Sequence, residues 1–135
     1  MYATVFQEFS PVELIKLLRI GQWKEVDADQ TLIEEGQKVD QIVFIFNGQA
    51  EVLSNGQRIN YLKDGAFIGE MELTKDRPSV ATVKTTSSTR YMTWSSVDIK
   101  QLLIRNPSTN STIQTIFSMD LMQKLQRQAS SSIQM

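Results

Sequence analysis

The chain has 135 residues, enough for one domain with one hydrophobic core, and its apolar fraction of 41% and charged fraction of 21% are those of ordinary globular proteins. It contains neither cysteine nor histidine, which excludes disulfides and the Ser-His-Asp and Cys-His nucleophile systems and leaves no usual ligand set for zinc. The formal net charge of −1 gives no electrostatic argument for nucleic-acid binding. No apolar run approaches the roughly 18 residues of a membrane span, and the first residues lack the features of a signal peptide.

A helix is predicted over residues 11–20. Ser10 can cap its N-terminus, Pro11 suits the first helical position, and Glu13 completes a capping box. Apolar residues at helical spacing follow, and Gly21 is expected to end the helix.

Strands are predicted next, because short runs rich in β-branched and aromatic residues alternate with glycine turns. The expected strands are residues 23–26, 31–33, 42–46, 50–53, 58–62, 80–86 and 89–93. The run at 42–46 is apolar throughout, which indicates a strand buried on both faces. Asn55-Gly56 is the strongest short hairpin signal, and Asp64-Gly65 predicts a second turn.

The apolar spacing becomes helical from residue 96. One helix is expected at 96–105, stopped by Asn106-Pro107, and a second from about 110 to about 128. The second helix carries an apolar stripe made of Ile113, Ile116, Phe117, Leu121 and Leu125. Met119 and Met122 add apolar surface beside the stripe, so this helix is expected to form a homodimer contact.

These elements predict a mainly β fold: an eight-stranded jelly-roll barrel with an N-terminal helix and C-terminal helices. The barrel is expected at about 22–94 within a single domain of residues 1–128, because no repeat or long linker divides the chain. Residues 129–135, with three consecutive serines, are expected to be a flexible tail.

The most informative stretch runs from residue 67 to residue 83. It reads Phe67-Ile68-Gly69-Glu70-Met71-Glu72-Leu73, then a charged loop ending in Arg77, and then Pro78-Ser79-Val80-Ala81-Thr82-Val83. This order resembles the phosphate-binding cassette of cyclic nucleotide-binding domains, the superfamily of the catabolite activator effector domain and the protein kinase A regulatory subunits. Residues 32–37 and 45–52 resemble the family's glycine turn and hairpin entry, so the likeness covers about residues 6–105.

The resemblance implies a division of labour in the cassette. The Glu70 carboxylate would accept a hydrogen bond from the ribose 2′-hydroxyl, and backbone amides after Gly69 would receive the phosphate oxygens. The family normally closes the site with an arginine that binds the phosphate, but Ser79 occupies that position. The Ser79 hydroxyl and Arg77 are the two candidate substitutes, and Val80, where cGMP-preferring members often have threonine, gives no support for cGMP.

The candidate ligand-binding residues are therefore those of the cassette, and cAMP is the expected ligand. No catalytic residue, metal ligand or cofactor is expected. The ligand-binding candidates are Phe67, Ile68, Gly69, Glu70, Met71, Glu72, Leu73, Arg77, Pro78, Ser79, Val80, Ala81 and Thr82.

The C-terminal part looks like that of Popeye domains, which are cyclic nucleotide-binding-like modules that commonly follow membrane helices. The resemblance lies in residues 90–94, in Leu102-Leu103 and Asn106-Pro107, and in Asp120-Leu121 and Lys124-Leu125. It implies that the chain is a cytoplasmic protein or the cytosolic domain of a membrane protein.

Two functions are expected ahead of all others. The first is a regulatory sensor that binds cAMP or a related small anion weakly, because Ser79 replaces the phosphate-binding arginine. The alternative is a ligand-free structural or oligomerisation module that keeps the fold. Too few residues follow the last predicted helix for a DNA-binding helix-turn-helix, and an enzyme is the least favoured class.

Overall fold

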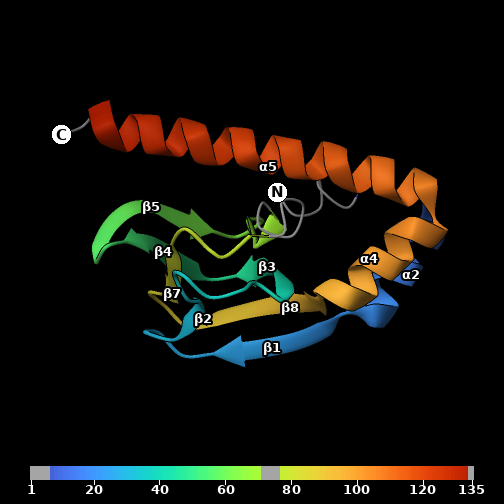
Figure 1. The fold of residues 1–135 in the computed structure, drawn as a ribbon, viewed down its shortest axis with the longest axis horizontal. Helices are drawn as coiled ribbons and strands as arrows, with labels where there is room; N and C mark the ends of the chain where they lie inside the picture. Colours follow the sequence, from blue (N-terminus) through green and yellow to red (C-terminus); the bar gives the residue numbers. More distant parts are fainter. Residues whose placement is uncertain (1–6, 71–76, 134–135) are drawn as a thin grey trace.

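In the part of the chain that the structure describes, residues 7–70 and 77–133 of a computed structural model, eight strands form two antiparallel sheets and three helices lie beside them (Figure 1). The strands are β1 (Gln22–Val26), β2 (Thr31–Ile33), β3 (Gln41–Asn47), β4 (Gln49–Ser54), β5 (Gln57–Lys63), β6 (Phe67–Ile68), β7 (Thr82–Thr85) and β8 (Thr89–Ser95). The helices are α2 (Pro11–Ile20), α4 (Ser96–Arg105) and α5 (Pro107–Ile133).

The two sheets have the jelly-roll connectivity that the strand pattern predicts. One sheet has the order β1-β8-β3-β6 and the other the order β2-β7-β4-β5. Figure 1 shows α2 and α4 together at one end of the sheets, while α5 runs across them towards the β4–β5 hairpin. The predicted mainly β fold with an N-terminal helix and C-terminal helices is confirmed, but the described strands form two sheets and do not join into a closed barrel.

Strand β3 separates two apolar layers, which explains its continuous apolar sequence. Ile42 and Phe44 pack in one cluster with side chains from all three described helices. Val43 and Ile45 point to the opposite face and pack with side chains of the second sheet. All four are at most 1% exposed, so the prediction of a strand buried on both faces is confirmed.

The predicted N-terminal helix and central hairpin are also confirmed. Ser10 and Glu13 form the capping box of α2, and Asn55 and Gly56 have the positive φ angles, 53° and 81°, of a two-residue hairpin turn. Gly21 ends α2, but with a φ of −87° rather than in a left-handed conformation. A Cβ atom there would lie 2.8 Å from the Trp94 Nε1 atom, so close packing is what requires glycine at this position.

Helix α5 differs from its prediction at both ends. It begins at Pro107 rather than near residue 110, because proline suits the first turn of a helix, where no amide hydrogen is needed. It continues to Ile133, so the helix extends into the segment that was expected to be a tail.

The apolar stripe of α5 largely serves the chain's own core. Ile113, Ile116 and Phe117 are buried in the cluster that also contains the Phe44 side chain. The stripe is therefore not free surface over this part of the helix. Among the α5 residues whose side chains the structure describes, 107–128, the exposed large apolar ones are Met119, Met122 and Leu125, which are 38%, 61% and 56% exposed.

This difference gives a prediction about stability. Replacing Ile116, which is 2% exposed, with alanine should lower the free energy of unfolding by about 2–5 kcal/mol, because a buried side chain is lost and a cavity remains. Met122→Ala on the same helix is the matched control and should change it by less than about 0.5 kcal/mol. Urea unfolding measures both, and equal effects would show that α5 is not docked on the core.

Candidate functional site

A cavity of about 270 Å³ opens between the cassette, the inner faces of the strands and α5. The sheets and the β4–β5 region contribute Ile33, Val52, Ile59, Asn60, Leu62 and Val83. The cassette contributes Ile68, Gly69, Glu70, Ser79, Val80 and Ala81, and α5 contributes Leu121, Lys124, Leu125 and Gln128. The walls are mainly apolar with a few polar groups, as in many small-molecule sites.

Gly69 places the cassette against the sheet. Its φ of +92° lies in the region that favours glycine, and a Cβ atom would lie 2.7 Å from the Gln41 carbonyl oxygen. Because the backbone can approach the neighbouring strand this closely, the next residue, Glu70, turns into the protein and is only 3% exposed. A side chain at residue 69 would therefore displace the carboxylate on which the site depends.

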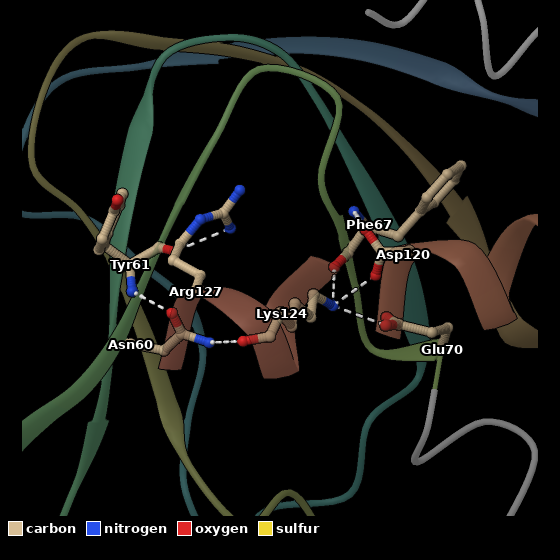
Figure 2. A network of polar contacts seen from close by, with 7 residues as sticks. All are labelled: Asn60, Tyr61, Phe67, Glu70, Asp120, Lys124 and Arg127. Atoms are coloured by element: carbon tan, nitrogen blue, oxygen red, sulfur yellow. Dashed lines mark hydrogen bonds and ion pairs between the residues drawn. The ribbon is translucent and has the colours of Figure 1, made fainter. Parts of the chain in front are cut away.

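The Glu70 carboxylate is bound by a lysine from α5. The Lys124 Nζ atom lies 2.6 Å from Glu70 Oε1 and 2.7 Å from Asp120 Oδ2, and it donates a hydrogen bond to the Phe67 carbonyl oxygen (Figure 2). The contact between Lys124 and Asp120 is an ion pair. Asp120 Oδ2 has no hydrogen-bond partner among the described residues. Asp120 Oδ1 in turn accepts a hydrogen bond from the Phe67 backbone amide at 3.0 Å. These contacts join α5 to the strand that leads into the cassette.

Burial and charge act against each other in this cluster. Burial raises the pKa of Glu70 to about 7, although the positive charge of Lys124 lowers it in part. Burial alone would lower the pKa of Lys124, but the two carboxylates outweigh that effect and raise it. The ammonium therefore stays charged at neutral pH, while the Glu70 carboxyl group exchanges a proton near pH 7.

Ser79 is buried, and its hydroxyl group is used locally. The Ser79 Oγ atom donates to the Ala81 carbonyl oxygen at 2.6 Å and accepts from the Ala81 amide at 3.3 Å. A hydroxyl group has one hydrogen to donate, so a contact to a phosphate would cost the bond to the Ala81 carbonyl.

The cassette residues separate into a group at the cavity and a group away from it. The predicted residues that line the cavity are Ile68, Gly69, Glu70, Ser79, Val80 and Ala81. Phe67 does not line it, because its ring packs between Phe44 and Phe117 in the core, and it contributes its backbone instead. Met71, Glu72 and Leu73 lie outside the described residues.

The remaining predicted residues face elsewhere. Arg77 is exposed and does not line the cavity, so its geometry gives no support for a role as the substitute phosphate ligand. Pro78 pairs with Lys38 in an isolated antiparallel bridge and does not line the cavity. The Thr82 hydroxyl accepts a hydrogen bond from the Glu35 backbone amide, which fixes a turn rather than contacting the cavity.

Sequence reasoning did not predict the roles of Asp120 and Lys124. An acidic and a basic residue at i and i+4 on a helix usually form an exposed pair. The signal that could have found them is position, because residues 113, 116, 117, 120 and 124 follow one helical stripe. Charged residues that continue a buried stripe are expected to contact a partner inside the protein.

The comparisons with known proteins identify the family. The model of the family described as "Cyclic nucleotide-binding domain" matches residues 23–106, so the chain belongs to this family. A cyclic nucleotide-gated potassium channel of Rhizobium etli is 28% identical over 109 residues, which are 81% of this chain and 30% of the channel. The chain spans only 28–30% of the length of the curated relatives that it matches.

Solved structures support the same fold. A cyclic nucleotide-binding domain from Methylobacillus flagellatus has a TM-score of 0.84 at 22% identity, over 96% of this chain and 81% of that one. The catabolite activator protein of Thermus thermophilus has a TM-score of 0.74 at 18% identity, over 88% of this chain and 58% of that one. The Popeye-like character of the C-terminal part stays a prediction. None of the described helices is long and apolar enough to cross a membrane.

The raised pKa of Glu70 predicts how stability depends on pH. In the unfolded chain this pKa is about 4.5 and in the folded protein about 7, so the folded state binds the proton more tightly. The contribution of Glu70 to stability is fully present below pH 4.5 and is lost as the pH rises through 7, by at most about 1.4 kcal/mol per pH unit.

Glu70→Gln removes this titration and is the reference. As the pH rises from 5 to 8, the unfolding free energy of the wild-type protein should fall relative to that of Glu70→Gln. A difference that stays constant over this range would contradict the buried position of the carboxyl group.

Proposed function

We propose that this chain is a regulatory, non-enzymatic sensor domain that binds cAMP or a related small anion weakly. The observation that carries the proposal is the buried Glu70 carboxylate behind Gly69 in the wall of the cavity. It stands where the family resemblance implies a ribose acceptor. The cavity also has apolar walls that suit a purine base, as the family membership leads us to expect.

Weak binding follows from the phosphate side of the site. Ser79 is the cassette residue at the position of the usual arginine, and its hydroxyl group carries no charge and already bonds to Ala81. Among the described residues that line the cavity, Lys124 is the one with a positive charge, and its ammonium group already forms ion pairs with two carboxylates. The phosphate of a cyclic nucleotide would therefore meet no uncommitted cation among the described cavity residues.

The context of the domain is part of the proposal. The matched relatives, among them channels described as cyclic nucleotide-gated, are more than three times as long as the matched region. We therefore propose that this chain acts as the cytosolic regulatory domain of a longer protein or of an assembly, where movement of α5 would carry the signal.

Ser79→Arg tests the phosphate side of the site. Arginine should supply a charge-assisted contact worth about 1.5–3 kcal/mol, which corresponds to roughly 10–100-fold tighter binding of cAMP. Glu70→Ala in that background should remove the gain, since the ribose would lose its acceptor. Calorimetric titration measures both, and a folded Ser79→Arg protein with no response to cAMP would refute ligand sensing at this cavity.

The second candidate is a ligand-free interaction module. It is favoured by one observation, namely that Lys124 already occupies the ribose acceptor Glu70. In this function the exposed apolar side chains of α5, which include Met119 and Met122, would contact a second copy of the chain.

Self-association can be tested directly. The double variant Met119→Glu/Met122→Glu should sediment as a monomer at concentrations where the wild-type protein is dimeric, because like charges would face each other. Val12→Glu, at a residue of α2 that is 62% exposed, is the control and should not change the association. A wild-type monomer at high concentration would contradict the α5 contact.

A further inference from the structure

We propose that Lys124 is an internal competitor for the ligand: its ammonium group occupies the Glu70 carboxylate, so that a ribose binds only when Lys124 and the part of α5 around it are displaced. The proposal rests on the proposed function, because it takes Glu70 as the ribose acceptor. It adds a residue outside the cassette that sets both affinity and the coupling to α5.

The carboxylate that would accept the ribose is already in use. The Lys124 Nζ atom is 2.6 Å from Glu70 Oε1, the distance of a charge-assisted hydrogen bond. A ribose hydroxyl is a neutral donor, and a hydrogen bond from it is weaker than one from an ammonium group. Ribose binding therefore has to offset the loss of a stronger contact, and the affinity for the ligand falls by that difference.

Lys124 is held at several points. Asp120 and the Phe67 carbonyl oxygen bind the ammonium group, and the Lys124 backbone oxygen accepts a hydrogen bond from Asn60 Nδ2 at 3.2 Å. One turn further along α5, Arg127 lies over the Tyr61 ring at 5.1 Å and donates to the Tyr61 carbonyl oxygen (Figure 2). Displacing the ammonium group thus loosens a series of contacts between α5 and the β5–β6 region.

The lysine and the ligand would share the same space. Leu121, Lys124 and Leu125 form the α5 wall of the cavity that Glu70 faces. The Lys124 side chain is 17% exposed and extends from this wall to within 2.6 Å of the carboxylate. A ribose that reaches Glu70 from the cavity must therefore move this side chain. Because Lys124 belongs to α5, the movement can be transmitted along this helix.

The test uses a variant that removes the competitor at constant charge. The wild-type cluster has two carboxyl groups and one ammonium group, and Asp120→Asn/Lys124→Gln removes one charge of each sign, so the formal charge of the cluster is unchanged. This double variant should bind cAMP about tenfold more tightly than the wild type. The gain should be smaller for 2′-deoxy-cAMP, which has no hydroxyl group for Glu70.

Arg127→Gln is the matched control for a loosened helix. It removes the contacts of α5 to Tyr61 without touching Glu70, so any gain in cAMP affinity should be smaller than that of the double variant and equal for cAMP and 2′-deoxy-cAMP. If the double variant binds cAMP no more tightly than the wild type does, or if Arg127→Gln gives the same gain, the competition is overturned while weak cAMP binding stands. If only the double variant binds, the competition is supported and the proposed binding by the wild-type protein fails. If neither the wild-type protein nor the double variant binds cAMP, both the competition and the proposed function fail.

A measurement on the wild-type protein alone avoids any dependence on the folding of variants. Under saturating cAMP, backbone amides at residues 120–128 should exchange their hydrogens faster, while those of α2 should not change. Slower or unchanged exchange at residues 120–128 in the cAMP-bound protein would overturn the displacement of α5.

Discussion

The ammonium group of Lys124, held between the carboxylates of Glu70 and Asp120, is the contact on which the arrangement of this site depends (Figure 2). It joins the last helix of the chain to the cassette that the fold places at the cavity. Breaking a buried ion pair by removing one partner usually costs about 3–5 kcal/mol, because a charge is left without compensation. The position of α5 and the state of the Glu70 carboxyl group are therefore linked through one side chain.

The rest of the site follows from steric constraints on the sheet. Gly69 brings the backbone close to Gln41 and directs Glu70 inward, and β3 presents apolar residues on both faces. One face of β3 receives the helices and the other faces the second sheet, and Phe67 and Ile68 at the start of the cassette pack into these two layers. The family's fold is thus retained, while the cation at the phosphate position is absent at Ser79.

Much of the fold could be predicted because its signals are local. A few neighbouring residues are enough to predict each of three features. These are the capping box at Ser10 and Glu13, the Asn55-Gly56 turn and the apolar run of β3. The start of α5 was misplaced because Pro107 can either end one helix or begin the next, and the sequence favours neither reading alone. The division of the strands into two sheets that do not close into a barrel also escaped prediction, since it depends on strand pairing between distant residues.

The sequence by itself determined the fold class and the resemblance to the family, because periodicity, turn chemistry and motif order are properties of neighbouring residues. It proposed thirteen cassette residues as ligand-binding, and only the tertiary structure placed six of them at the cavity. Only the tertiary structure decided that Arg77 faces away from the cavity and that Lys124 enters it. Lys124 is 54 residues from Glu70 along the chain, and an i,i+4 pair with Asp120 reads as a surface pair until packing buries it. The physical reason is that a charge acquires its partner and its burial from chain segments that meet only when α5 docks on the sheets.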